Sequence, residues 1–192
     1  WYFHKYEAVL RVRHYAVAGL LLIVPFALIA KQPDLGTAIL VGAAGFYVIF
    51  FAGLPWKVII GMIAAAATAA PFVWTMLHGY QRKRILTLID PTTDPLGSGY
   101  HIIQSTIAIG SGGTFGKGWL EGTQTHLEFI PERHTDFIFA VFSEERGLLG
   151  NSILVLLYLL LIARGLMITS NASTLFARVM AGSITLSFFT YA

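Results

Sequence analysis

A dense cluster of ionisable residues lies immediately before an apolar run at 137–142. The cluster consists of Glu132, Arg133, His134 and Asp136. Ionisable groups at the edge of an apolar phase are costly to hold, which makes them candidates for a functional site. The simplest chemistry for such a group is a single carboxylate that acts as a general base and deprotonates a hydroxyl nucleophile. We therefore predict Asp136 as the base, with Arg133 and Lys117 as its counter-charges.

Two carboxylates could also act as a pair, as they do in glycoside chemistry. On a helix that starts at Thr135, Glu144 would lie about 12 Å along the axis from Asp136, beyond the roughly 5–9.5 Å that such pairs use. Glu132 is nearer if Pro131 is the first helical residue, so a pair of Glu132 and Asp136 stays open. A third interpretation makes Asp136 only a helix cap.

The glycine-rich run at 110–119 contains Lys117 and matches a phosphate-binding loop only in part. A Walker loop requires a glycine before four spacer residues and Ser or Thr after the lysine, but Ser111 and Gly118 hold these places. An ATP site is therefore not expected. Gly116, Lys117 and Gly118 could still cradle an anion such as a diphosphate through backbone N–H groups and one ammonium. A flexible glycine turn is the alternative.

The segment Pro-Asp-Leu-Gly-Thr at 33–37 is typical of a helix start. Proline fits the first turn of a helix, and an acidic side chain is stabilised by its positive amide end. In the alternative interpretation, Asp34 is a buried ion-pair partner of Lys31 or Lys117 and fixes the wall of a cavity. Asp34 and Lys31 are therefore candidates for a structural role beside the site.

Metal-binding residue types occur between 126 and 136, but their spacing is weak evidence for a metal site. The spacings are His-x-Glu and His-x-Asp, and the chain has no cysteine to complete a zinc site. We expect no resident metal. A transient divalent cation, Mg²⁺ or Mn²⁺, beside a diphosphate stays open.

Composition indicates that the apolar phase around these residues is a membrane. Of the 192 residues, 56% are hydrophobic and 12% are charged, and the mean hydropathy is +0.69. A soluble domain carries roughly 25% charged residues, so we predict an integral membrane protein. The 13 Lys and Arg residues are scattered, which is typical of loop charges and argues against nucleic-acid binding. The sequence starts at Trp1 and stops within an apolar run, so we expect an internal piece of a longer protein.

Apolar segments predict an all-α polytopic bundle with about five membrane spans. The spans are expected at about 16–30, 35–54, 58–77, 148–163 and 174–192. The stretch at 1–14, rich in aromatic and basic residues, is expected at the membrane interface. Residues 78–147 form a large polar loop, and loops of this size are usually functional.

The short-loop charges predict the orientation of the spans. If the amino end is cytoplasmic, Lys57, Arg164 and Arg178 also lie inside and the large loop lies outside. The run Gln-Arg-Lys-Arg at 81–84 is then an exception to the positive-inside rule. It is either a helix within the loop or, through Arg82, a site for an anionic ligand.

Three motifs in this order resemble the SEDS family, which includes RodA and FtsW, and the resemblance is strongest to the RodA branch of rod-shaped bacteria. They are Lys-Gln-Pro-Asp-Leu-Gly-Thr-Ala (31–38), Gly-Ser-Gly-Gly-x-x-Gly-Lys-Gly (110–118), and Pro-Glu-x-His-Thr-Asp-Phe-Ile-Phe (131–139) followed by Glu-Glu-x-Gly (144–147). The resemblance covers essentially the whole chain and implies a roughly ten-span fold, of which this is the central and later part. It matches Asp136 to the family's essential loop aspartate, Lys117 to its Gly-Lys-Gly lysine and Asp34 to its Pro-Asp aspartate.

The resemblance implies a peptidoglycan glycosyltransferase of the bacterial cytoplasmic (inner) membrane. Such an enzyme polymerises lipid II for cell-wall elongation, together with a class B penicillin-binding protein transpeptidase and other elongation-complex proteins. Asp136 would deprotonate the acceptor sugar, and an undecaprenyl diphosphate would leave from the donor. Lys117, Arg133 and Arg82 or a divalent cation would stabilise its charge, and Glu132 and His134 would contact the substrate.

Two other functions predict different patterns. A transporter or flippase for the lipid-linked precursor would place charges near mid-span and repeat broken helices. Here the second to fifth predicted spans carry almost no charge, and the ionisable residues gather on one side, which favours chemistry at the membrane surface. A scaffold that only recruits the transpeptidase would tolerate Asp136→Ala.

Overall fold

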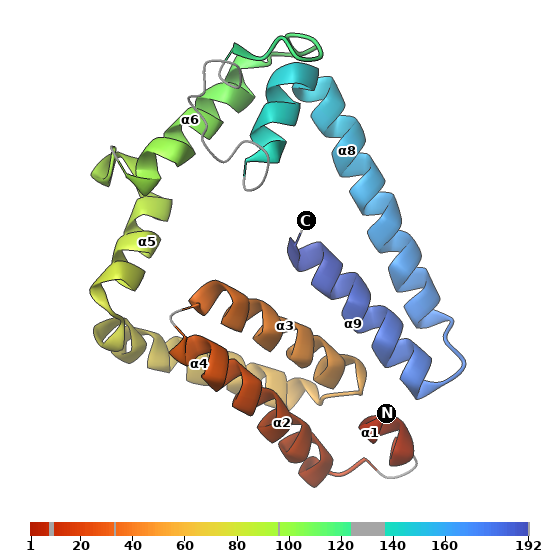
Figure 1. The fold of residues 1–192 in the computed structure, drawn as a ribbon. Helices are drawn as coiled ribbons and strands as arrows, with labels where there is room; N and C mark the ends of the chain where they lie inside the picture. The colour runs from red at the N-terminus through yellow and green to blue at the C-terminus, as the bar shows by residue number, and fades with distance from the viewer. Residues whose placement is uncertain (8–9, 33, 96, 124–136, 192) are drawn as a thin grey trace. The chain divides into compact units, whose positions relative to one another are not determined.

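The protein is helical throughout the part that the structure describes. The computed structural model describes residues 1–7, 10–32, 34–95, 97–123 and 137–191, and within these ranges no strand occurs. The helices are α1 (Tyr2–Lys5), α2 (Val12–Lys31), α3 (Leu35–Phe51), α4 (Trp56–Met76), α5 (Gly79–Ile89), the 3₁₀ helix η2 (Pro91–Thr93), α6 (Ser98–Ser111), α8 (Ile138–Ser170) and α9 (Leu175–Tyr191) (Figure 1).

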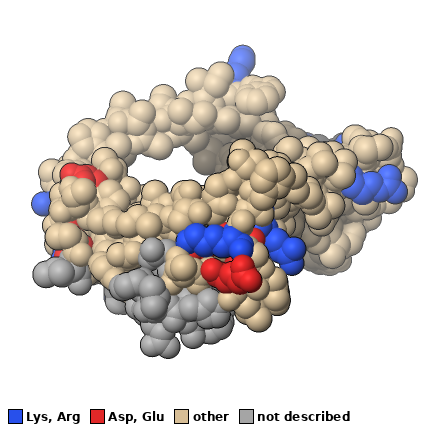
Figure 2. All heavy atoms as spheres, turned by 90° about the horizontal axis from the view of Figure 1, so that it is seen from above, with Lys and Arg blue, Asp and Glu red and all other residues tan. Residues whose placement is uncertain are grey.

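The apolar helices have the length and surface of a membrane protein. Among the described residues, α2, α4 and α8 are long and apolar enough to cross a membrane, and α3 and α9 are shorter apolar helices. Several large hydrophobic side chains are exposed on α2, α4, α8 and α9, and Ile39 is exposed on α3. Lys, Arg, Asp and Glu occupy only a small part of the face shown in Figure 2. Contiguous exposed apolar surface on this scale indicates contact with lipid or with further protein, and the fold is a polytopic helical membrane protein.

The observed helices extend the predicted pattern in two places. A helix lies at each of the five predicted spans, but α8 already begins at Ile138, inside the predicted loop, and continues to Ser170. The predicted loop at 78–147 also contains α5, η2 and α6. The bilayer boundaries on these helices stay predictions.

The helices belong to two compact units. The first contains Trp1–Ala64 and Tyr158–Ala192, and the second contains Ala65–Leu157. In the first unit α3 packs against both α2 and α9 (Figure 1). Glycines allow this close approach, since Gly45 of α3 lies against Leu22 of α2 and Gly182 of α9 lies against the Phe51 ring of α3. Small residues at helix interfaces are typical of packing in membranes.

Gly182→Ala is expected to destabilise the first unit. A Cβ at Gly182 would lie 2.6 Å from ring carbons of Phe51, and overpacking of this kind costs roughly 1–3 kcal/mol. A Cβ added at Gly61 in α4 would have nothing within 4 Å. Gly61→Ala is therefore expected to leave the stability of the protein unchanged or to raise it by up to about 1 kcal/mol. Thermal unfolding in detergent compares the two variants, and equal effects would contradict the close packing.

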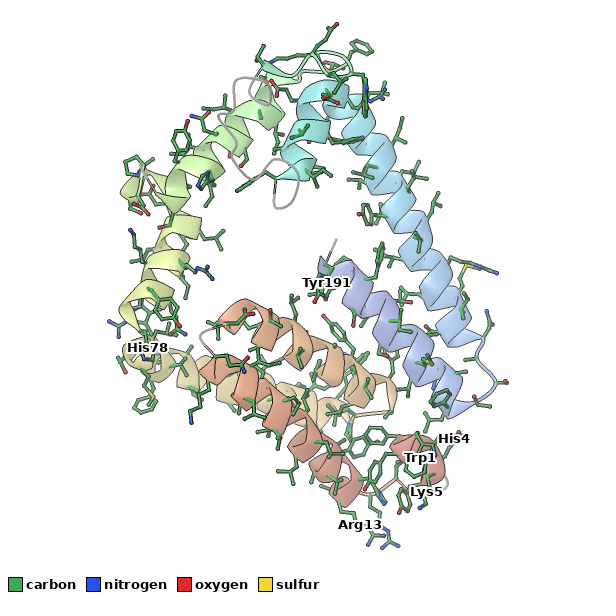
Figure 3. The ribbon with its side chains drawn as sticks, viewed as in Figure 1. Trp1, His4, Lys5, Arg13, His78 and Tyr191 are labelled. Carbon is green, nitrogen blue, oxygen red and sulfur yellow. The ribbon has the colours of Figure 1, made fainter. Side chains whose placement is uncertain are left out.

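The aromatic and basic stretch at the amino end folds onto the first unit. Phe3 of α1 is buried with Ala52 and Leu175. The Lys5 ammonium lies 5.5 Å from the centre of the Trp1 ring, a cation–π contact. Figure 3 labels Lys5 of α1 and Trp1, the residue before that helix. Mixed aromatic and basic side chains suit the headgroup region of a bilayer, and that location stays a prediction.

Candidate functional site

Helix α8 is broken at Gly147, which has φ 63° and ψ −163°. In an unbroken helix the N–H groups of Leu148 and Leu149 would donate to the carbonyls of Glu144 and Glu145. Glycine adopts the left-handed backbone at this position without the steric cost of a Cβ. The break therefore leaves two donors and two acceptors in need of other partners, because buried backbone groups are almost always paired.

The glycine-rich loop that follows α6 satisfies these four backbone groups. The bonds run from Leu148 N–H to Gly113 O (2.8 Å), Leu149 N–H to Thr114 O (3.0 Å), Lys117 N–H to Glu144 O (3.0 Å) and Gly118 N–H to Glu145 O (3.2 Å). We call this arrangement, residues 112–118 bound to 144–149, the glycine clamp. Figure 1 shows the loop after α6 lying against the first part of α8. The loop thus replaces the helical bonds that the break removes.

A buried ion pair lies beside the glycine clamp. Lys117 Nζ is 2.7 Å from Glu144 Oε1, and the Glu144 side chain is 0% exposed whereas that of Lys117 is 28% exposed. Lys117 Nζ also donates to Thr123 Oγ1 at 2.7 Å, and that hydroxyl lies 3.2 Å from Glu144 Oε1. A buried charge requires such partners, and removal of one partner of a buried pair typically costs about 3–5 kcal/mol.

The two residues after Glu144 hold the next part of the loop. Glu145 Oε1 accepts a hydrogen bond from Leu120 N–H at 3.1 Å, and Leu120 has a φ of 63°, which is uncommon for a residue with a Cβ. The Arg146 guanidinium lies 5.4 Å from the centre of the Trp119 ring. Three consecutive residues of α8 therefore bind three different positions of the loop.

The predicted base and its nearest neighbours in sequence lie outside the described residues. These are Asp136, Arg133, Glu132 and His134. The structure describes both ends of that segment. Thr123 contacts Glu144, and the Phe137 carbonyl accepts the N–H of Ala140 at 3.0 Å in the first turn of α8. Both ends of the chain that carries Asp136 are therefore attached to the first part of α8.

The glycine amides that were predicted to bind an anion donate to the protein itself. Gly116 N–H donates to Gly112 O at 2.8 Å, and Gly118 N–H donates to Glu145 O at 3.2 Å. Within the described part of the chain, Lys117 uses two of the three N–H groups of its ammonium. The structure thus gives Gly116 and Gly118 a place in the clamp, and substrate binding by Gly116, Lys117 and Gly118 stays a prediction.

Arg82 contacts the end of a helix. Its Nε and Nη2 donate to the carbonyls of Trp74 at 3.0 Å and Thr75 at 2.6 Å, in the last turn of α4. A cation is stabilised there by the unpaired carbonyls and by the negative end of the helix dipole. The basic run at 81–84 lies on α5, as one of its two interpretations predicted. Anion binding by Arg82 stays a prediction.

Asp34 starts α3, as the motif predicted. Its Oδ1 accepts the Thr37 N–H at 3.1 Å, which makes it the N-cap of the helix. The Asp34 side chain is exposed, and Lys31 is the last residue of α2. Asp34 and Lys31 belong to the first unit, whereas Lys117 belongs to the second.

The expectation of no resident metal stays a prediction, and a transient divalent cation stays open. Among the described residues, no group of three or more His, Cys, Asp or Glu side chains is placed to hold a metal ion. The residues with metal-binding types at 126–136 lie outside the described ranges.

Sequence reasoning had assigned no site role to Glu144, Thr123 or Ser111. The Ser111 hydroxyl lies 3.4 Å from Glu144 Oε1, so it is a further polar group beside that carboxylate. The sequence does contain a signal for a site at Glu144, because two adjacent carboxylates, 144 and 145, follow an apolar run. Carboxylates in an apolar environment need polar partners. The pattern does not say which partners they take.

Comparisons with known proteins agree on one family. The FtsW/RodA/SpoVE model, described as "Cell cycle protein", matches residues 1–192. The peptidoglycan glycosyltransferase MrdB of Escherichia coli (strain K12) is 55% identical over 181 residues, which are 94% of this chain and 49% of that protein. The probable peptidoglycan glycosyltransferase FtsW of Geobacter metallireducens is 38% identical over 169 residues, 86% of this chain and 44% of that protein.

A solved structure has the same fold. It is described as "Structural coordination of polymerization and crosslinking by a peptidoglycan synthase complex", and it matches with a TM-score of 0.70 and 37% identity over 94% of this chain and 49% of that chain. The chain spans about half the length of the relatives it matches. Because the family model matches residues 1–192, the chain belongs to the FtsW/RodA/SpoVE family. This is the SEDS family that its motifs resemble.

Proposed function

We propose that this chain is part of a peptidoglycan glycosyltransferase that polymerises lipid II for cell-wall elongation and rod shape. Relatives named peptidoglycan glycosyltransferase match 94% and 87% of this chain. The observation that carries the proposal is the attachment of both ends of the Asp136 segment to α8, at Thr123 and at Phe137. A segment whose two ends are held at one helix can place a general base at a reacting hydroxyl.

In the proposed reaction Asp136 removes the proton from the 4-hydroxyl of the acceptor's N-acetylglucosamine. The resulting oxygen forms a bond to the anomeric carbon of the lipid-linked donor and inverts it. The bond from that carbon to the diphosphate oxygen breaks, and undecaprenyl diphosphate leaves with the electron pair. The Lys117 ammonium, with Arg133 and Arg82, stabilises this charge, and Glu132 and His134 contact the sugars.

An apolar cavity in the first unit offers space for part of the polyprenyl chain. It has a volume of about 710 Å³ and lies between α2, α3 and the start of α4. Tyr15, Phe46 and Met62 are among the residues that line it. Pockets for apolar ligands are concave and lined by such side chains, which supports a lipid-linked substrate.

The proposed partner is a class B penicillin-binding protein transpeptidase, together with other elongation-complex proteins. The solved relative belongs to a peptidoglycan synthase complex that coordinates polymerization and crosslinking. We place the assembly in the bacterial cytoplasmic (inner) membrane, as the family resemblance implies, and three helices long and apolar enough to cross a membrane support this.

The test is polymerisation of lipid II by the purified full-length protein with its transpeptidase, with glycan strands separated on a gel. We expect strands that lengthen with time. Movement of fluorescent lipid II between the leaflets of a vesicle, without polymer, would instead indicate a flippase. If neither activity is seen while the transpeptidase is still bound, the protein is a scaffold.

The same assay tests the proposed divalent cation. Mg²⁺ or Mn²⁺ beside the diphosphate would add positive charge where the leaving group forms. We expect EDTA to lower the rate and added Mg²⁺ or Mn²⁺ to restore it. An unchanged rate in EDTA would remove the cation from the mechanism.

A further inference from the structure

We propose that Glu144 is a positioning residue for the transfer reaction, and that it acts through Lys117 and Thr123. The inference rests on the proposed function, since it concerns the same site. Glu144 would direct the Lys117 ammonium towards the leaving diphosphate and fix the point from which residues 124–136 extend.

The difference in burial between the two charges sets their roles. The Glu144 side chain is 0% exposed, and the Lys117 side chain, 2.7 Å away, is 28% exposed. A ligand that approaches from solvent can therefore meet the ammonium but not the carboxylate. Glu144 can act on such a ligand by placing and orienting Lys117.

Thr123 links the ion pair to the segment that carries the predicted base. Its hydroxyl oxygen lies 2.7 Å from Lys117 Nζ and 3.2 Å from Glu144 Oε1, so the three polar groups form a closed triangle. Residues 124–136 follow Thr123 directly. The triangle thus couples the position of the ammonium to the start of the Asp136 segment.

The docking of the loop does not depend on this side-chain pair. Four backbone hydrogen bonds of the glycine clamp already hold residues 112–118 to α8, and one of them joins the Lys117 N–H to the Glu144 carbonyl. The backbone of Lys117 is thus held in place even without the Glu144 carboxylate. What the carboxylate adds is the direction of the ammonium, and charge-assisted hydrogen bonds are strong enough to set it.

The experiment compares Glu144→Gln, Lys117→Met and the double variant in the full-length protein with its transpeptidase. Gln keeps a hydrogen-bond acceptor and nearly the same shape but removes the charge. We expect Glu144→Gln to lower kcat for lipid II polymerisation by about 10- to 100-fold with little change in KM, because a displaced group can cost up to about 100-fold. Lys117→Met is expected to lower kcat at least as much.

The double variant separates positioning from a structural role. The double variant removes both charges of this pair and so leaves neither of the two without the other, and we expect its thermal unfolding temperature to return towards that of the wild type. Its kcat is expected to stay as low as that of Lys117→Met. If kcat recovers together with stability, or if Glu144→Gln polymerises like the wild type, the inference is overturned.

Lys83→Met serves as the matched control, because it removes an ion pair in the same unit. Lys83 Nζ lies 3.0 Å from Asp94 Oδ2, with the Lys83 side chain 63% exposed and that of Asp94 20% exposed, and a pair that is open to solvent on one side contributes less than a fully buried pair. We expect less than about a twofold change in kcat, and a loss equal to that of Glu144→Gln would overturn the inference. A wild-type protein that makes no polymer would instead contradict the proposed function.

Discussion

Asp136→Asn is expected to abolish glycan polymerisation while the protein stays folded. Asn keeps the shape of the side chain but cannot accept the proton of the attacking hydroxyl. General base catalysis typically contributes about 10²- to 10⁴-fold, so the initial rate of polymerisation is expected to fall by that factor. The rate is measured from glycan strands formed from lipid II by the full-length protein with its transpeptidase.

Two control measurements make this loss interpretable. The thermal unfolding temperature and the amount of co-purified transpeptidase should match those of the wild type. If both match and polymer disappears, Asp136 is the base and the interpretation as a helix cap is wrong. If Asp136→Asn polymerises normally, Asp136 is structural, and the flippase and scaffold hypotheses return.

Gly116→Ala is expected to disrupt the glycine clamp and to reduce both stability and polymerisation. Gly116 has a φ of 80°, and a Cβ there would overlap the carbonyl of Glu145. Alanine at a positive φ costs more than about 1 kcal/mol, and the overlap adds roughly 1–3 kcal/mol. The bonds that replace the broken helical bonds of α8 should weaken, so hydrogen exchange at the amides of Leu148 and Leu149 is expected to become faster.

Gly110→Ala is the control for this substitution. Gly110 lies near the end of α6, and a Cβ there would have nothing within 4 Å. We expect the variant to be as stable as the wild type or up to about 1 kcal/mol more stable, because glycine inside a helix is less stable than alanine. If Gly110→Ala and Gly116→Ala have equal effects on exchange and stability, the clamp does not hold the break in α8.

Local patterns were sufficient to predict the class of the fold. Long apolar segments place α2, α4 and the second part of α8 in an apolar environment, where only structures with internally paired backbones are stable. The start of α3 was also predictable, because Asp34 bonds to an N–H three residues away. Such features depend on neighbours within one or two helical turns, which a sequence displays directly.

The helices within the loop were harder to predict. Residues 79–89 contain several charged side chains, yet they form α5. The Arg82 guanidinium stabilises the end of α4, and Lys83 pairs with Asp94. These contacts link one element to another, whereas periodicity within a single segment reports only on that segment.

The sequence by itself determined an all-helical membrane protein, the family motifs and the candidate base. Only the tertiary structure decided what the glycine-rich loop does. Gly147 breaks the helical bonds of α8, and their replacement donors and acceptors come from a loop far away in the chain. Lys117 and Glu144 are 27 positions apart, and no local pattern pairs them. Burial determines this pairing, because a carboxylate removed from water must find a cation and hydrogen-bond donors wherever the fold supplies them.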